Sequence, residues 1–399
     1  MVLQDCFSKI ITGEWGEECN DNKGTPIIRT TNFLPSGKID YSKLAFRSIN
    51  QNKLKEKALK SGDIILEKSG GTDTTPVGRV VYCDERIDES VFLCNNFTQA
   101  MRVDRDIALP KFMFYCMHYL HQSGKTDLLQ NKTTGIRNLR MRDYLNQSVA
   151  LPSVIEQHRI ATILDKAIDI IALRKKQCAL LDLMLKSRFV EMFGDPVTNP
   201  LKWKSIKLGN ALIEKPQNGL YKPASSYVND DTGTPILRID AFYDGKLKEL
   251  SLLKRLQCSE NEVEKYRLEN GDIVINRVNS IEYLGKCAYI IGLVEDTVFE
   301  SNMMRIKADR VILHPLFLTK ILCTSFIYNQ VLAHAKKAVN QASINQQDVQ
   351  DFDLLLPPLE LQNSFVDFVR QVDKSKFEIQ QGLKKLELQY NALMQQYFG

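Results

Sequence analysis

Residues 24–29 read Gly-Thr-Pro-Ile-Ile-Arg, and the same sequence returns at residues 233–238 with a single change, Leu237 in place of Ile28. The run Gly-Asp-Ile-Ile at residues 62–65 returns as Gly-Asp-Ile-Val at residues 271–274, with the same shift of 209 positions. Two motifs that repeat with the same shift indicate an internal duplication of a long stretch of this chain.

The repeat continues to the end of the chain with a shift of 205 positions. Leu151-Pro152 returns as Leu356-Pro357, and Phe193-Gly194 returns as Phe398-Gly399. A change of four residues in one loop explains the difference between the two shifts. Solenoid repeats are far shorter, roughly 20 to 50 residues. We therefore expect each copy to be a domain with its own core, and the chain to be a pseudo-dimer.

Composition agrees with two ordinary globular cores. The chain has 399 residues, of which 44% are hydrophobic, enough to bury more than one core. The net charge of +5 permits an anionic partner without demanding one. The nine cysteines include no CxxC pair and no Cys/His cluster, which favours isolated thiols in a reducing compartment. With neither a leader-like N-terminus nor an apolar run of membrane-span length, we expect a cytoplasmic protein.

Each copy combines a globular part with a long helix. Residues 1–150 carry short β-rich runs, such as Arg79-Val80-Val81-Tyr82, mixed with an apolar helical stretch around residues 110–120. Neither Gly nor Pro interrupts residues 154–193. The fold class expected is α+β, with two similar mixed globular domains joined by a pair of long antiparallel helices. The predicted parts are a first globular domain (1–150), a central helix (151–196), a second globular domain (197–355) and a C-terminal helix (356–399).

Each predicted helix carries one apolar stripe with alternating steps of four and three. Arg174 and Arg188 interrupt the first stripe, and Lys376 interrupts the second. The simplest prediction is that the stripes pack against each other within the chain; an external dimerisation zipper is the less favoured alternative. A rigid helix pair between two similar heads would suit a long, repetitive ligand such as double-stranded DNA. The stripe residues are Ile160, Leu164, Ala167, Ile171, Cys178, Leu181, Leu185 and Met192, then Phe365, Val369, Val372, Ile379, Leu383, Leu386, Tyr390, Leu393 and Tyr397.

Sequence motifs of catalysis are mostly missing. The run Gly124-Lys125-Thr126 resembles the end of a phosphate loop, but Tyr119 stands where the first glycine is required. Asp244-Gly245-Lys246 and Glu262-Val263-Glu264-Lys265 resemble nuclease carboxylates only loosely, because such pairs arise freely in a chain that is 25% charged. We therefore predict no catalytic, metal or cofactor site in this chain.

Polar runs follow both Gly-Asp-Ile strands. Residues 66–75 read Leu-Glu-Lys-Ser-Gly-Gly-Thr-Asp-Thr-Thr, and residues 275–280 read Ile-Asn-Arg-Val-Asn-Ser. Side chains of these types donate to phosphates and read base edges. A solvated polar turn is the alternative for one such loop, but recurrence in both copies favours DNA binding. The predicted DNA-binding residues are Lys68, Ser69 and Thr72 in the first loop and Arg277, Asn279 and Ser280 in the second.

A second pair of polar runs precedes the long helices, at residues 131–137 and 336–344. Lysines followed by small polar residues suit phosphate contact, although these groups could equally be capping and surface residues. The predicted DNA-binding residues here are Lys132, Arg137, Lys336 and Lys337.

These features together resemble one protein family. The duplicated layout, the run Gly-Asp-Ile-Val-Ile-Asn-Arg-Val-Asn at residues 271–279, the Leu-Pro-x-x-x-x-Gln helix entrances and the Phe-Val-Glu-Met-Phe-Gly-Asp-Pro closure at residues 189–196 resemble the specificity subunit of type I restriction-modification systems. One departure is that the first copy lacks a counterpart of Trp203-Lys204, which leaves its first edge strand in doubt.

The resemblance implies two target recognition domains that each read half of a split DNA sequence. It also implies that the helices seat two methyltransferase subunits and, through them, the restriction and translocase subunits. S-adenosylmethionine, ATP and Mg²⁺ would belong to those partners, and this chain would hold no cofactor. We expect a non-catalytic DNA-recognition subunit; the alternative is a two-headed scaffold for protein or anionic partners, and a self-contained nuclease or methyltransferase is disfavoured by the missing motifs.

Overall fold

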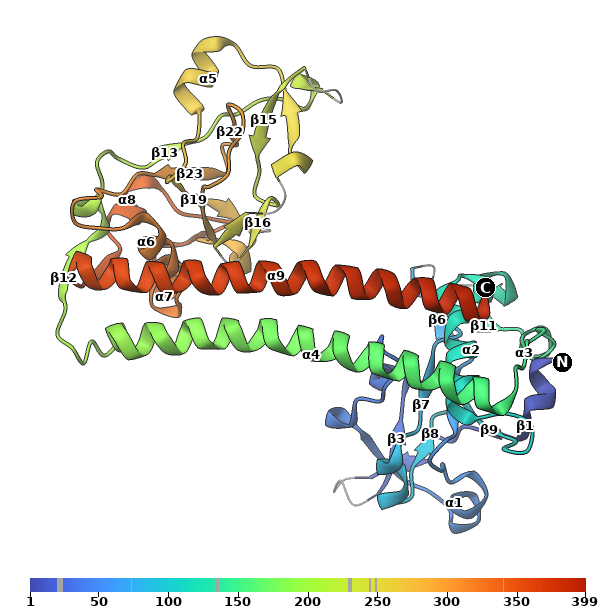
Figure 1. Ribbon diagram of the computed structural model, residues 1–399. Helices are drawn as coiled ribbons and strands as arrows, with labels where there is room; N and C mark the ends of the chain where they lie inside the picture. The colour runs from blue at the N-terminus through green and yellow to red at the C-terminus, as the bar shows by residue number, and fades with distance from the viewer. Residues whose placement is uncertain are drawn as a thin grey trace. The chain divides into compact units, whose positions relative to one another are not determined.

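A computed structural model describes residues 1–19, 24–72, 74–133, 136–228, 232–243, 245–247, 250–339 and 341–399 (Figure 1). The chain divides into two compact units. Unit 1 comprises residues 1–177 and 379–399, and unit 2 comprises residues 178–378. Each long helix contributes one part to each unit, so each globule is built together with segments of both helices.

Unit 1 begins with a short 3-10 helix, η1 (Leu3–Cys6), and its strands and α-helices follow in mixed order. They are β1 (Phe7–Thr12), β2 (Glu17–Glu18), β3 (Thr25–Ile28), β4 (Ala45–Ser48), α1 (Gln51–Lys57), β5 (Ile64–Glu67), β6 (Ser69–Gly71), β7 (Val80–Tyr82), β8 (Leu93–Cys94), β9 (Thr98–Val103), α2 (Pro110–Gln122), β10 (Gln130–Thr133), β11 (Ile136–Leu139), α3 (Met141–Leu145) and the start of α4 (Val154–Phe193).

Unit 2 continues from α4 and ends within the last helix. Its elements are β12 (Lys204–Lys207), β13 (Gln217–Asn218), β14 (Tyr227–Val228), β15 (Thr234–Leu237), β16 (Phe242–Tyr243), β17 (Lys246–Leu247), β18 (Lys254–Leu256), α5 (Glu260–Tyr266), β19 (Ile273–Asn276), β20 (Val278–Asn279), β21 (Cys287–Tyr289), β22 (Val298–Phe299), β23 (Met303–Ile306), α6 (Pro315–Leu322), α7 (Ser325–His334), β24 (Lys336–Lys337), β25 (Ala342–Ser343), α8 (Gln346–Gln350), β26 (Asp353–Leu356) and the start of α9 (Leu359–Phe398).

The two units share one sheet topology. The central antiparallel sheet has the strand order β1-β9-β5-β7 in unit 1 and β13-β23-β19-β21 in unit 2. A second sheet runs β2-β4-β3-β8 and β14-β18-β15-β22, and in both copies its last pair is parallel. The repeated Thr-Pro-Ile runs lie on corresponding strands of these sheets, and the repeated Gly-Asp-Ile runs lead into corresponding strands. The duplication predicted from sequence is therefore confirmed at the level of strand order.

The repeated Gly-Asp-Ile motif has a backbone explanation. Gly62 and Gly271 have φ values of +93° and +107°, a left-handed conformation that favours glycine. The N–H of Gly62 donates to the carbonyl of Cys83 at 2.9 Å, and the N–H of Gly271 donates to the carbonyl of Ile290 at 2.8 Å. This turn sends the chain into the buried strands β5 and β19, where a β-branched run is expected.

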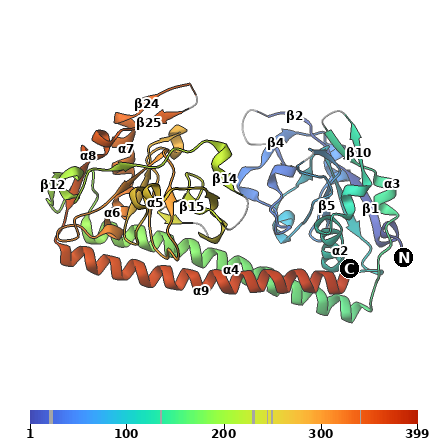
Figure 2. The same cartoon turned by 90° about the horizontal axis from the view of Figure 1, so that it is seen from above.

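The two long helices pack antiparallel within each unit. In unit 1 the first half of α4 and the last part of α9 share a hydrophobic cluster, to which they contribute Ile160, Leu164, Tyr390 and Met394. In unit 2 the cluster takes Leu185 and Phe189 from α4 and Phe365 and Val369 from α9. The two views of Figures 1 and 2 agree that the helices lie side by side. The stripes therefore contact each other, as expected, but they also form part of each globular core, which the periodicity could not reveal.

Lys376, the polar residue predicted within the second stripe, is 8% exposed and forms an ion pair with Asp182 of α4. A buried ammonium is costly without a partner. Asp182 thus explains how the stripe tolerates a lysine.

The Leu-Pro-x-x-x-x-Gln motif ties each long helix to its unit. Gln157 and Gln362 are 1% and 0% exposed. The side-chain oxygen of Gln157 accepts the N–H of Leu109 at 2.9 Å, and its amide donates to the carbonyl of Pro152 at 3.0 Å. Gln362 makes the matching bonds with His314 and Pro357, both at 2.9 Å, and a third to the carbonyl of Ile312 at 3.0 Å. Leu109 and His314 precede α2 and α6, so each glutamine joins two helix starts.

The edge strand in doubt differs between the units. In unit 2, β12 pairs with β26 from Lys204–Leu356 to Lys207–Asp353. In unit 1, the corresponding pairing is a single bridge between Val2 and Ser148. The sequence departure at Trp203-Lys204 thus corresponds to a shorter pairing in the first copy.

Among the described residues, no single helix combines the length and apolar character that a membrane span needs. α6 and α7 reach that threshold only together, and they are bent by 68° where they meet.

Candidate nucleic-acid interface

Each unit carries a small sheet built from the two kinds of polar segment that the sequence singled out. In unit 1 its strand order is β10-β11-β6, and in unit 2 it is β20-β25-β24. We call these the polar sheets. β6 and β20 directly follow the Gly-Asp-Ile strands, whereas the hairpins β10–β11 and β24–β25 lie ahead of the long helices. The sequence predicted separate loops; the structure corrects this, because backbone pairing joins the segments into one sheet in each unit.

In each unit, two main-chain hydrogen bonds hold a cationic residue at the corresponding point of the fold. The N–H of Lys68 donates to the carbonyl of Phe97 at 3.0 Å, and its carbonyl accepts the N–H of Leu139 at 2.8 Å. The N–H of Arg277 donates to the carbonyl of Asn302 at 2.8 Å, and its carbonyl accepts from Ile344 at 2.9 Å. The backbones of Lys68 and Arg277 are thus fixed identically where each central sheet meets its polar sheet.

The Arg277 side chain is also held in part. It is half-buried, and one guanidinium nitrogen donates to the carbonyl of Ser301 at 3.1 Å. A guanidinium carries five N–H donors, so one such bond leaves capacity for a ligand. This geometry gives Arg277 a restricted direction rather than the freedom of a solvated lysine.

Side chains on and after β6 make hydrogen bonds within the protein. The Ser69 hydroxyl contacts the amide oxygen of Asn138 on β11. The Thr72 hydroxyl lies 2.7 Å from that of Thr75 and accepts the Thr75 N–H at 3.2 Å. Thr72 is exposed, and its hydroxyl closes a turn. Asp73, within the same predicted loop, lies outside the described residues.

Asn279 and Ser280 lie at the end of β20 and are half-buried. The Asn279 side-chain oxygen accepts the N–H of Ser280 at 2.8 Å. An asparagine that reads adenine bidentately uses both its oxygen and its amide nitrogen. Asn279 would have to release Ser280 before it could make that contact.

The second hairpin exposes its cations. Lys336 and Lys337 on β24 are exposed, and Val339 beyond them is 98% exposed. The N–H of Ala338 donates to the carbonyl of Gln341 at 2.7 Å, which closes the hairpin. Asn340 lies outside the described residues.

The first hairpin corresponds to the second in position. Arg137 lies half-buried on β11 and pairs with Gly71 of β6. Lys132 lies on β10 opposite Arg137, and its side chain falls outside the described part of the chain, as do Thr134 and Gly135. In each unit, the predicted cationic residues thus lie on the polar sheet or at its junction with the central sheet.

An ion pair beside Lys68 escaped the sequence reasoning. The Arg79 guanidinium donates to both carboxylate oxygens of Glu67, at 2.7 and 2.8 Å, and Glu67 is 4% exposed. The hydrogen bond from Arg79 to Glu67 raises the pKa of Arg79. In unit 2, Asn276 corresponds to Glu67 and Lys286 corresponds to Arg79. There the N–H of Asn276 donates to the carbonyl of Lys286 at 2.8 Å. The only sequence signal was a charge ending an apolar strand.

Of the loosely nuclease-like carboxylates, Glu262 has a structural role. Glu262 accepts the N–H of Ser259 at 2.9 Å and caps α5, and it forms an ion pair with Lys222 at 2.7 Å. Asp244 lies outside the described residues. Within the described part of the chain, no group of three or more His, Cys, Asp or Glu side chains could hold a metal ion.

Comparison with known proteins shows which proteins this chain is similar to. A family model described as the type I restriction modification DNA specificity domain matches residues 8–182 and 200–388. The specificity subunit of the type I restriction enzyme EcoKI from Escherichia coli K12 is 25% identical over 366 residues, which cover 87% of this chain and 75% of that protein. The StySPI specificity subunit from Salmonella potsdam is 26% identical over 387 residues, covering 93% and 80%.

Solved structures share the fold. The S subunit of a type I restriction-modification system from M. genitalium aligns with a TM-score of 0.61 at 13% identity, covering 100% of this chain and 95% of that one. A chain from a structure on complex assembly and conformational transition of the type I system aligns with a TM-score of 0.57 at 16% identity, covering 100% and 96%. Because the family model matches both copies over most of the chain, this protein belongs to the type I restriction modification DNA specificity family.

Proposed function

We propose that this chain reads a bipartite double-stranded DNA target, and that the polar sheet of each unit reads one half. The observation that carries the proposal is the repeated polar sheet, with Lys68 and Arg277 held at corresponding points by the same main-chain hydrogen bonds. The polar sheets contain the hairpins β10–β11 and β24–β25, and a two-stranded β-ribbon of this kind is narrow enough to enter the major groove of DNA. Two such ribbons in one chain suit a target made of two half-sites.

The polar residues would divide into two roles. Lys336 and Lys337, exposed on β24, suit phosphate contacts, which set register without reading sequence. Arg277, directed by its bond to Ser301, suits a base edge, where arginine pairs with guanine. Lys68, Ser69, Thr72, Lys132 and Arg137 would serve unit 1 in the same way, and Asn279 and Ser280 would serve unit 2.

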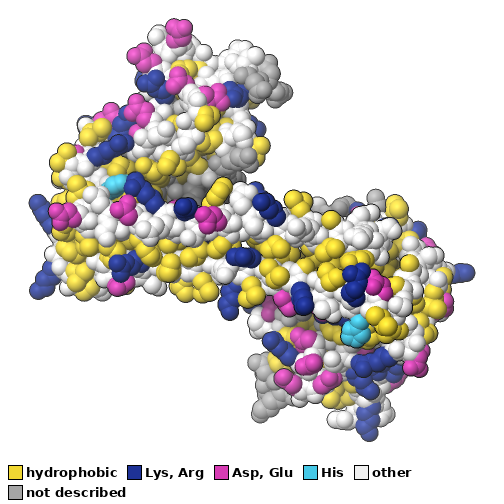
Figure 3. Space-filling view, viewed as in Figure 1, with side chains coloured by type: hydrophobic (Ala, Val, Ile, Leu, Met, Phe, Trp, Pro, Cys, Tyr) yellow, Lys and Arg dark blue, Asp and Glu magenta, His cyan; other side chains and the backbone are white. Residues whose placement is uncertain are grey.

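The exposed faces of the long helices suit partner subunits. In unit 2, α4 exposes Leu180, Leu183, Met184 and Val190 by 42–58%, and α9 exposes Phe377 by 60%. Figure 3 shows hydrophobic side chains gathered over α4. Large exposed apolar patches on soluble proteins mark interaction sites. We assign these faces to two methyltransferase subunits, which would in turn carry the restriction and translocase subunits.

The chemistry would reside in those partners. They would hold S-adenosylmethionine, ATP and Mg²⁺, and the assembly would work in the cytoplasm. The parts of the chain would be a first recognition domain (1–150), a central helix (151–196), a second recognition domain (197–355) and a C-terminal helix (356–399).

Exchange of one recognition domain tests the proposal. Residues 1–150 are replaced by the equivalent domain of a family member with a different target, and the chimera is produced with its methyltransferase subunit. We expect the methylated motif, read by methylation-sensitive sequencing of the host genome, to change in one half only. The matched control replaces residues 197–355 and should change the other half.

Chimeras that alter both halves would show that the two domains do not read independently. Methylation of DNA by the purified chain alone, supplied with S-adenosylmethionine, would contradict the assignment of catalysis to partner subunits.

A further inference from the structure

Two cysteines far apart in the sequence meet in unit 2. The Sγ atoms of Cys287 and Cys323 lie 3.6 Å apart. Cys287 lies on β21, and Cys323 directly follows α6, which packs against β21. The sequence predicted isolated thiols; this pair corrects that expectation, because the β21–α6 contact brings together residues 36 positions apart.

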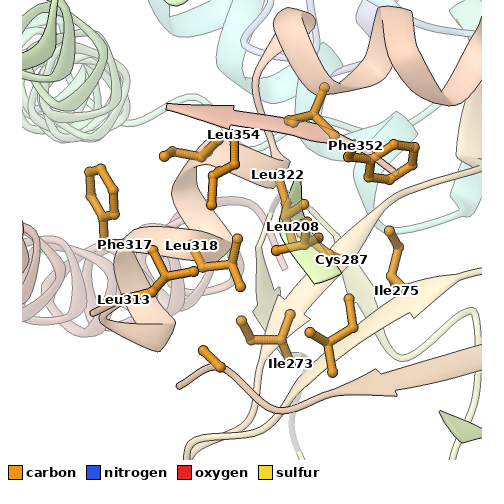
Figure 4. Packing of buried hydrophobic residues seen from close by; sticks show 14 of the residues in the cluster. Leu208, Ile273, Ile275, Cys287, Leu313, Phe317, Leu318, Leu322, Phe352 and Leu354 are labelled. Atoms are coloured by element: carbon orange, nitrogen blue, oxygen red, sulfur yellow. The ribbon is translucent and has the colours of Figure 1, made fainter. Parts of the chain in front are cut away.

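The two thiols differ sharply in environment. Cys287 is 1% exposed, and Figure 4 shows it in the core near Leu208, Ile275 and Leu322. Its thiol also lies 3.7 Å from the carbonyl of Thr319. Cys323 is exposed and lines a surface groove of about 1000 Å³ with Lys320 and Thr324. A small oxidant in solvent therefore reaches Cys323 first.

Burial supports the same asymmetry. The hydrogen bond with Cys323 and burial in the core raise the pKa of the Cys287 thiol well above its ordinary value. The thiolate is the reactive form of cysteine. Cys287 is thus poorly suited to react with solvent, but it is positioned to react with its neighbour.

The first copy lacks this pair. The strand registers place Val80 of β7 where unit 2 has Cys287 of β21. The 205-residue shift places His118 where unit 2 has Cys323. The dithiol is therefore a property of the second copy rather than of the shared frame.

We propose that Cys287 and Cys323 form a redox-modifiable dithiol that hydrogen peroxide closes into an intramolecular disulfide. The Cys323 thiolate attacks one peroxide oxygen, the O–O bond breaks, and the products are a Cys323 sulfenic acid and hydroxide. The sulfur of Cys287 then attacks the Cys323 sulfur and displaces the sulfenic oxygen, which leaves as water with the proton that Cys287 gives up. Overall, two thiols lose two electrons and one peroxide is reduced to two waters.

The closure needs only a small movement. A disulfide requires the sulfurs to approach to about 2.05 Å, and they already lie 3.6 Å apart. Cys323 is the C-cap residue of α6, and the residue as a whole is exposed. Rotation of its side chain, with loss of the weak contact between Cys287 and Thr319, would bring the sulfurs together.

Peptide mapping of the full-length protein tests this proposal. The reduced chain is treated with a slight excess of hydrogen peroxide, the remaining thiols are alkylated, and peptides are identified by mass spectrometry. We expect a linked pair of peptides joining Cys287 to Cys323, lighter by two hydrogens than the sum of the separate peptides and separated by dithiothreitol. Half-buried Cys178 and Cys258 serve as internal controls and should stay alkylated and unlinked.

A variant tests the order of the steps. In Cys287→Ala, the Cys323 sulfenic acid has no resolving thiol, so its capture by dimedone should rise severalfold over the wild-type chain. Thermal unfolding checks that the variant is folded, and mapping of the wild-type chain is independent of it. The proposal is overturned if the wild-type chain forms no Cys287–Cys323 link while Cys323 becomes oxidised, or if dimedone labels Cys323 equally in both proteins.

Discussion

Units 1 and 2 attach their polar sheets through the same main-chain bonds and pair them in the same strand order, but they carry different side chains there. In both units, the residue after the Gly-Asp-Ile strand is held by main-chain bonds to Phe97 and Leu139 or to Asn302 and Ile344. Beside it, Ser69 pairs with Asn138 in unit 1, whereas Val278 pairs with Ser343 in unit 2. The comparison shows that main-chain bonds fix how each polar sheet is attached. The side chains that would face DNA differ between the units.

Replacement of a helix-entrance glutamine should have the largest effect on stability, because it leaves several buried polar groups without a partner. Both units have such a glutamine, which allows the two to be compared. Gln362→Leu leaves the N–H of His314 and the carbonyls of Ile312 and Pro357 without their partner in a buried site. Unpaired buried groups cost about 1 to 3 kcal/mol each, and we expect a total loss of about 3 kcal/mol of unfolding free energy after relaxation. Urea unfolding of the full chain measures it.

Gln157→Leu should cost less, about 2 kcal/mol, because Gln157 bonds to Leu109 and Pro152 but makes no third bond of this kind in the described structure. Gln381→Leu, at an exposed position of α9, is the matched control and should change stability little. Equal, small effects at all three positions would show that the motif does not hold the helices.

Acid should destabilise unit 1 more than unit 2, because unit 1 contains the buried His118. His118 of α2 is 6% exposed and stacks on Phe114, with ring centroids 5.4 Å apart. Burial, with a smaller effect of His121, lowers the pKa of His118 to about 4. The unfolded chain therefore takes up a proton at higher pH than the folded chain, and this part of the stability is present above about pH 6.5 and is lost as the pH falls toward 4.

We expect His118 to cost the protein about 2 kcal/mol of stability between pH 7 and pH 4.5. His118→Leu should remove that part of the pH dependence, measured as thermal unfolding across this range. His158→Leu, at an exposed position of α4, is the control. Unit 2 has Cys323 at the matching position, so acid unfolding that begins in unit 2 would contradict this account.

The smallest expected effect comes from exchanging the corresponding cationic residues, Lys68 and Arg277. Arg277→Lys makes unit 2 resemble unit 1, and we expect a loss of about 1 kcal/mol in discrimination at one base pair, because an ammonium lacks the planar fork of the guanidinium. Binding of the assembled methyltransferase complex to targets with each base pair changed in turn measures it. Lys68→Arg is the reciprocal variant. A loss that is even across all targets would show that Arg277 contacts phosphate only.

The sequence predicted the frame well because its signals are local and repeated. The Gly-Asp-Ile turn and the helix entrances each lie within a few residues, the apolar stripes repeat within one continuous helix each, and the recurrence of all three in both copies supports each one. The α+β fold with paired long helices was therefore confirmed.

The polar sheets could not be predicted in the same way. β6 pairs with β11 across more than sixty residues, and no periodicity within either segment encodes that partner. The bond between Asn279 and Ser280, the ion pair of Glu67 and Arg79 and the approach of Cys287 to Cys323 likewise depend on tertiary contacts. The predicted residues of each unit lie on its polar sheet or directly beside it in the chain, but which of them touch DNA stays a prediction.

The main-chain bonds of Lys68 and Arg277 also bear on how a target can change over evolutionary time. Since those bonds use only N–H and C=O groups, nearly any amino acid except proline can replace the cation without losing them. New side chains can then be sampled at little cost to folding, so altered specificities can accumulate as point mutations. Randomised libraries at these two positions should therefore contain mostly folded proteins.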